Sequence, residues 1–103
     1  MIRHIVLVKF KSDTSEQTIQ NLFDRLAGLR EQLPGMRDFD ASLSLSPEGL
    51  EQGFKYGICV DFVDEAARDA YLALPDHKAL GAELVGLAEG GINGLVVFDL
   101  KLG

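Results

Sequence analysis

The first ten residues of the chain predict a strand that is apolar on both faces. At a period of two, one face carries Ile2, His4, Val6, Val8 and Phe10, and the other carries Arg3, Ile5, Leu7 and Lys9. A small antiparallel sheet usually exposes one polar face to water. We therefore expect this strand to be covered on both sides.

The hydrophobic spacing predicts six further elements. The largest helix, over residues 15–32, has a cap at Thr14 or Ser15 and ends at Pro34-Gly35. Alternating residues predict strands over 36–45 and 54–63. Asp64 begins a short helix that Leu74-Pro75 breaks. A second helical segment, 77–88, follows with Asp76 as its cap, and the last strand is 95–102.

This order of elements predicts the architecture. Strand, helix, strand, strand, helix pair, strand is the ferredoxin-like β-α-β-β-α-β plan of the α+β class, with a four-stranded antiparallel sheet and helices on one face. The length favours a single domain over residues 1–103. Ile5, Leu7 and the last strand leave the second sheet face apolar. We expect a second copy to cover it, giving a homodimer built as a dimeric α+β barrel.

Composition narrows the class of partner. The chain carries a net charge of −6 and no block of basic residues, which argues against nucleic acid and anionic membranes. No apolar run is long enough to span a bilayer, and Lys9 and Lys11 interrupt any signal-peptide layout, so we expect a cytoplasmic protein. Cys59 is the only cysteine and falls in a strand pattern, which indicates a buried structural thiol.

Few side chains could carry chemistry. Tyr71 and His77 are six residues apart, and in one continuous helix they would face about 240° away from each other. A kink at Pro75 could aim both at one cavity. No metal-ligand spacing and no phosphate-binding glycine loop is present, so no metal or cofactor is expected.

Three stretches make the chain similar to a known family. The opening strand 1–10, the Leu45-Ser-Pro-Glu-Gly49 loop leading to Gly53-Phe-Lys-Tyr56, and the segment from Tyr71 to Pro75-Asp-His77 resemble the stress-responsive α/β-barrel (Dabb) family. The resemblance covers the whole chain and implies a dimeric α+β barrel. It implies no single activity, because most members have none assigned.

One plant member of that family is a cyclase that closes a linear polyketide thioester without a metal or organic cofactor. The resemblance places its catalytic histidine at His77, its catalytic tyrosine at Tyr71 and a pocket histidine at His4. The chain departs from the cyclase at Leu26 and Tyr56, where the cyclase has tyrosine and histidine, and has Leu74 where the family often has histidine. The pocket is expected to be more apolar and differently shaped.

Two classes of function remain open, and a third is weaker. The first is a non-catalytic barrel protein that binds a small apolar or carbonyl-containing ligand between sheet and helices. The second is a cofactor-free cyclase or lyase in which His77 is the general base and Tyr71 orients the carbonyl. A cofactor-free monooxygenase-like protein is the third. The expected pocket wall is formed by His4, Val6, Val8, Phe23, Leu26, Tyr56, Ile58 and Leu80.

Each of these residues also has a purely structural interpretation. His77 could make only a local hydrogen bond at a helix start beside Asp76. Tyr71 could be an edge residue of the core with a solvated hydroxyl. His4 on an apolar face could be a satisfied structural histidine, and Tyr56 could serve packing alone. A pocket in which His77 and Tyr71 both lie within hydrogen-bond reach of one common point would favour the enzyme. A filled core at that place would favour the non-catalytic interpretation.

Overall fold

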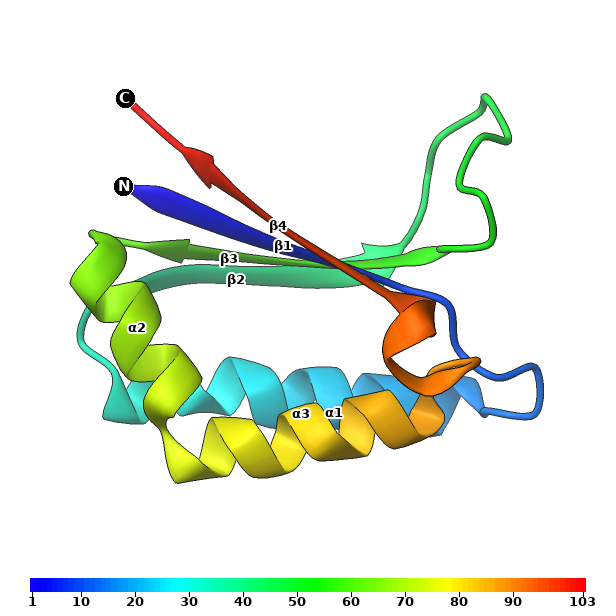
Figure 1. Ribbon diagram of the computed structural model, residues 1–103, viewed down its shortest axis with the longest axis horizontal. Coiled ribbons are helices and arrows are strands. Elements are labelled where there is room, and N and C mark those ends of the chain that lie inside the picture. The colour runs from blue at the N-terminus through cyan, green and yellow to red at the C-terminus, as the bar shows by residue number, and fades with distance from the viewer.

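The computed structural model describes all residues, 1–103, and has the predicted ferredoxin-like α+β architecture. Its four strands form one antiparallel sheet in the order β2-β3-β1-β4. All the helices lie on one side of this sheet, and its other side is open (Figure 1). The strands are β1 (Ile2–Val8), β2 (Met36–Leu43), β3 (Tyr56–Phe62) and β4 (Leu95–Lys101).

The helical elements begin and end close to the predicted positions. They are α1 (Glu16–Gly28), the 3-10 helix η1 (Leu29–Gln32), α2 (Glu65–Ala73), α3 (Pro75–Leu87) and the 3-10 helix η2 (Gly91–Gly94). The predicted helix 15–32 is thus an α-helix that tightens into a 3-10 turn after Gly28. The strands predicted over 36–45 and 54–63 are each shorter, because residues 44–55 form a long loop that extends away from the sheet (Figure 1).

Side chains cap two of the helices as the sequence predicts. The Ser15 hydroxyl accepts a hydrogen bond from the Thr18 amide at 3.1 Å, and the Asp64 carboxylate accepts one from the Ala67 amide at 2.8 Å. The prediction that Asp76 caps the second helical segment is wrong. The helix begins two residues earlier, at Pro75, whose missing N–H needs no cap.

One hydrophobic core fills the space between sheet and helices. Val6, Val8, Ile58, Val60 and Phe62 come from the sheet, and Leu22, Phe23, Leu26, Tyr71 and Leu80 are among those from the helices. Alternation along β3 turns Cys59 to the opposite side from Ile58 and Val60, so it is only half-buried. The expected buried thiol is therefore wrong for the isolated chain, because Cys59 lies on the open face.

The open face of the sheet is apolar at one end. Ile5 and Leu7 of β1 pair with Phe98 and Val96 of β4, and Phe98 is 58% exposed. At the other end of this face, Arg3 donates two hydrogen bonds to the carboxylate of Asp61 at 2.8 and 2.9 Å. The open face thus combines a large apolar area with one satisfied ion pair.

The two ends of the chain lie side by side at one end of the sheet (Figure 1). The amide of Leu102 donates a hydrogen bond to the carbonyl of Met1 at 2.9 Å, which continues the β1–β4 pairing beyond the last strand residue.

Candidate functional site

The junction of α2 and α3 brings together the two residues that the sequence singles out. Leu74 takes an extended backbone conformation, with φ −63° and ψ 125°, and so separates the two helices. The rings of Tyr71 and His77 consequently lie against each other in a tilted arrangement, with centroids 4.1 Å apart and planes inclined by 45°. The break at Pro75 therefore brings the two rings into contact, but no cavity of the structure is lined by either residue.

The sheet adds two rings to this pair. His4 of β1 meets Tyr71 edge-on, with ring centroids 6.0 Å apart, and Phe62 of β3 lies 5.0 Å from Tyr71 and 6.4 Å from His4. His4 is 5% exposed and Tyr71 is 3% exposed. Three separate parts of the chain thus bring together two imidazoles and a phenol, which we call the His–Tyr cluster: the buried His4 and Tyr71 and the half-buried His77.

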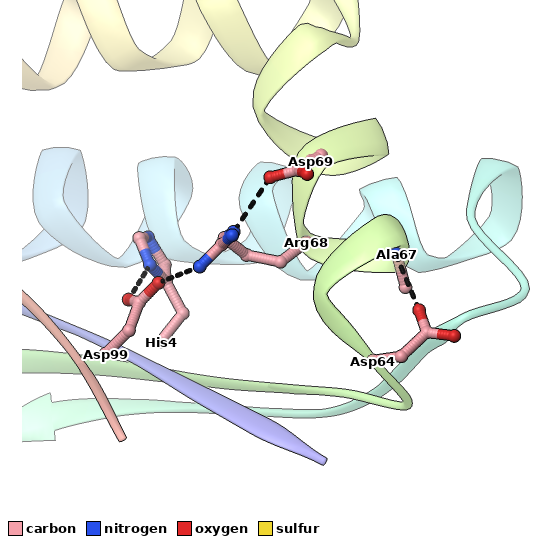
Figure 2. A network of polar contacts seen from close by, with 6 residues as sticks. All are labelled: His4, Asp64, Ala67, Arg68, Asp69 and Asp99. Carbon is pink, nitrogen blue, oxygen red and sulfur yellow. Dashed lines mark hydrogen bonds and ion pairs between the residues drawn. The ribbon is translucent and has the colours of Figure 1, made fainter. Parts of the chain in front are cut away.

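His4 is held by a chain of charged side chains. Its Nδ1 lies 2.7 Å from Oδ1 of Asp99, the residue directly opposite it on β4. Arg68 of α2 donates from Nη1 to the other oxygen of Asp99 at 2.8 Å and from Nε to Asp69 at 3.0 Å. Figure 2 shows Arg68 reaching from the helix to Asp99, whose carboxylate also contacts the ring of His4.

Burial and charge set the protonation states in this region. Burial raises the pKa of Tyr71 to about 12, so its hydroxyl remains a proton donor at neutral pH. Burial lowers the pKa of His77, and the charge of the nearby His4 lowers it further. A hydrogen bond with the backbone of Leu72 raises it by a smaller amount. Burial also favours the neutral form of Asp99, but hydrogen bonds from Arg68 and His4 outweigh it and keep its pKa below the usual range.

His77 carries an unsatisfied polar atom. Its Nδ1 is buried and has no hydrogen-bond partner. Buried polar atoms in proteins are nearly always paired, and leaving one unpaired costs about 1–3 kcal/mol. An orphaned nitrogen beside a buried phenol is a feature that a bound molecule could satisfy.

The other predicted pocket residues lie in or at the edge of the hydrophobic core. Val6, Val8, Phe23, Leu26, Ile58 and Leu80 all belong to the same buried core as Tyr71. Tyr56 packs at the edge of that core, where its ring contacts Phe10 at 5.2 Å and Phe23 at 6.2 Å. Tyr56 thus makes no ring contact with His4, Tyr71 or His77, and its ring contacts are separate from the His–Tyr cluster.

The cavities of the structure lie outside the His–Tyr cluster, and none of them is lined by His4, Tyr71 or His77. One cavity of about 470 Å³ is lined by Arg68 and Asp99 and reaches the surface beside Met1 and Lys101. Within the cluster, His4 and Tyr71 are buried and His77 is half-buried, so only His77 is partly open to solvent.

Sequence reasoning missed Asp99, Arg68 and Phe62 as members of the site. Asp99 is opposite His4 only because of the register between β1 and β4, and Arg68 reaches it only from α2. The alternation of the last strand shows which of its residues share a face with Asp99. It does not show which residue of β1 lies opposite Asp99, because that depends on the register of the folded sheet. No three His, Cys, Asp or Glu side chains gather in a way that could hold a metal ion.

The fold and the site define a ferredoxin-like α+β protein with a His–Tyr cluster between sheet and helices. A family model described as the stress responsive A/B barrel domain matches residues 2–102. The chain belongs to this family. None of its α-helices combines the length and apolar character that crossing a membrane requires.

Two curated proteins are similar in sequence. Stress-response A/B barrel domain-containing protein HS1 of Arabidopsis thaliana is 27% identical over 100 residues, which is 97% of this chain and 88% of that protein. Olivetolic acid cyclase of Cannabis sativa is 22% identical over 80 residues, 78% of this chain and 79% of the cyclase.

Solved structures share the fold over nearly the whole chain. A dimeric ferredoxin-like protein of unknown function from Jannaschia sp. CCS1 has a TM-score of 0.91 at 30% identity, covering 98% of each chain. Hydroxynitrile lyase from Passiflora edulis has a TM-score of 0.85 at 22% identity, covering 99% of this chain and 93% of the lyase. An antibiotic biosynthesis monooxygenase has a TM-score of 0.75 at 14% identity, covering 100% of this chain and 99% of that chain, a likeness of fold alone.

Proposed function

We propose that this chain forms a homodimer in which each subunit binds a small carbonyl-containing molecule at the His–Tyr cluster, between sheet and helices. The observation that carries the proposal is the buried Nδ1 of His77, which has no partner and lies beside the buried phenol of Tyr71. The Tyr71 hydroxyl would donate to the carbonyl oxygen, and apolar walls from Val6 and Leu80 would enclose the rest of the molecule.

The open sheet face supports the homodimer. Four large apolar side chains on this face are each at least 37% exposed: Leu7, Val96, Phe98 and Leu100. Large apolar patches on small proteins mark interaction surfaces. Two such sheets stacked face to face would remove these side chains from water, and a structural relative at 30% identity is described as dimeric.

Light scattering at micromolar concentration tests the assembly. We expect twice the 11.2 kDa of one chain for the unmodified protein, and the mass of one chain for Phe98→Asp, because a buried unpaired carboxylate opposes the interface. Ile92→Asp is the matched control, since Ile92 is 73% exposed on η2 and lies outside the sheet. A Phe98→Asp protein that remains dimeric would exclude the open face as the interface.

Ligand binding tests the site. Ethyl acetoacetate, a small β-keto ester, is titrated into ¹⁵N-labelled protein, and we expect the signals of His77 and α2 to shift. Tyr71→Phe removes one hydrogen bond worth about 0.5–1.5 kcal/mol, so the dissociation constant is expected to rise by roughly 2- to 13-fold. Asp24→Asn, on the exposed side of α1, should bind like the unmodified protein. Shifts confined to the surface cavities, or equal binding by Tyr71→Phe, contradict the proposal.

A second candidate function is cofactor-independent carbonyl chemistry of the cyclase or lyase type. The lowered pKa of His77 favours it, because that imidazole is neutral at pH 7 and can accept a proton. His77 would take the proton from the carbon next to the carbonyl, and the electron pair would move to the carbonyl oxygen. Tyr71 would stabilise the resulting enolate by donating a hydrogen bond to that oxygen. The monooxygenase alternative rests on a likeness of fold alone.

A further inference from the structure

Asp99 is held between two partners on opposite sides of its carboxylate. Oδ1 lies 2.7 Å from Nδ1 of His4, and Oδ2 accepts a hydrogen bond from Nη1 of Arg68 at 2.8 Å. Rotation of the carboxylate about its terminal torsion would therefore break both contacts. Figure 2 shows both contacts of the carboxylate, one with the imidazole and one with the guanidinium.

The contact with Asp99 decides which nitrogen of His4 carries the proton. An ionised carboxylate can only accept hydrogen bonds, so the neutral imidazole must donate from Nδ1. Nε2 then keeps its lone pair and becomes an acceptor. Because His4 is 5% exposed and its ring meets that of Tyr71 edge-on, this acceptor belongs to the His–Tyr cluster and not to solvent.

Arg68 contributes more to this arrangement than an ordinary surface ion pair. Its side chain crosses from α2 to β4 and is 21% exposed, while the carboxylate of Asp69, its other partner, is 66% exposed. Exposed pairs such as Arg68–Asp69 contribute little to stability. The contact with Asp99 is the one that connects Arg68 to a buried functional group.

We infer that Arg68 is a positioning residue of the proposed site: it fixes Asp99 in the rotamer that holds His4 as the Nδ1–H tautomer, with Nε2 free to accept a hydrogen bond or proton from the ligand. The inference rests on the proposed function only for the role of the ligand. The tautomer itself is a property of the unliganded protein and can be measured without any activity.

Long-range ¹H–¹⁵N spectra of the full-length ¹⁵N-labelled protein measure that tautomer directly. The chain has two histidines, so a His77→Asn variant assigns the His4 signals without ambiguity. Spectra are recorded at pH 8, where free histidine is neutral. We expect His4 in the unmodified protein to show a protonated Nδ1 and an unprotonated Nε2 as a single population.

Three variants separate positioning from general stability. Arg68→Gln removes the charge and is expected to convert His4 from one tautomer to a mixture, whereas Arg68→Lys, which can still pair with Asp99, should retain the Nδ1–H form. Arg25→Gln is the control, because Arg25 also donates to a carboxylate, that of Glu83 at 2.6 and 2.8 Å, and neither residue is hydrogen-bonded to His4, Arg68 or Asp99. The cavity of about 470 Å³ beside Arg68 gives the replacement side chains room.

Two results would overturn the inference. One is an unmodified protein in which His4 carries its proton on Nε2, an outcome that needs no variant to fold. The other is a folded Arg68→Gln protein whose His4 keeps the pure Nδ1–H tautomer. If Arg68→Gln changes the tautomer but the unmodified protein binds no carbonyl compound, the proposed function fails while the positioning role of Arg68 stands.

Discussion

Replacing Phe62 with alanine is expected to lower the free energy of unfolding by about 3–5 kcal/mol, the usual cost of truncating a buried aromatic ring. Phe62 is fully buried and is among the largest fully buried side chains of the core. Its ring also contacts Tyr71 at 5.0 Å and His4 at 6.4 Å. The truncation therefore removes core volume at the point where sheet and α2 support the His–Tyr cluster.

Urea denaturation at fixed protein concentration measures this loss, since dimerisation would make stability depend on concentration. Phe62→Leu refills part of the space and should cost clearly less than Phe62→Ala. Ile92→Ala, at a position 73% exposed, should change the free energy by less than about 0.5 kcal/mol. A Phe62→Ala protein as stable as the Ile92→Ala protein would show that this part of the core does not support the fold as described.

Replacing His77 with glutamine is expected to slow deuterium exchange at the acidic carbon of ethyl acetoacetate by roughly 10²- to 10⁴-fold, if the chain performs carbonyl chemistry. Glutamine keeps a polar side chain but cannot accept the proton. NMR in deuterated buffer follows the exchange, with the buffer rate subtracted. Asp76→Asn is the control, because the neighbouring Asp76 is exposed and accepts a hydrogen bond from Gln32, outside the cluster.

The pH dependence of that exchange follows from the direction of the His77 shift. The protonated imidazole cannot act as a base, and burial lowers its pKa below the ordinary value of 6.5. The rate should therefore be constant above about pH 6.5 and fall on the acid side. Equal rates for His77→Gln and the unmodified protein would remove His77 from the mechanism and leave ligand binding as the function to test.

Local sequence rules predicted the elements well where one physical signal dominates. The spacing of Ile19, Leu22 and Phe23 and the cap at Ser15 locate α1, and Asp64 locates the start of α2. The rules failed at Asp76, because Pro75 can occupy the first turn of a helix without a donor and so moved the helix start. They also failed at Cys59, because alternation fixes opposite faces without saying which one the helices cover.

The candidate site was predictable only in its local part. Tyr71 and His77 are six residues apart, and the effect of Pro75 on their relative orientation follows from backbone rules alone. Asp99 lies 95 residues from His4 and meets it through the β1–β4 register, while Arg68 arrives from a third element. Such contacts are set when the whole sheet and α2 come together, and no window of sequence contains them.

The neighbouring ends of the chain make the path of the polypeptide almost a closed ring. A short flexible linker could join Leu102 to Met1 where their backbones already meet. New ends opened near Gly49, in the loop that extends from the sheet, would leave all strand pairings unchanged. A circular permutant of this kind would make β4 and β1 consecutive strands, so that the long-range contact between His4 and Asp99 becomes a local one across a designed hairpin.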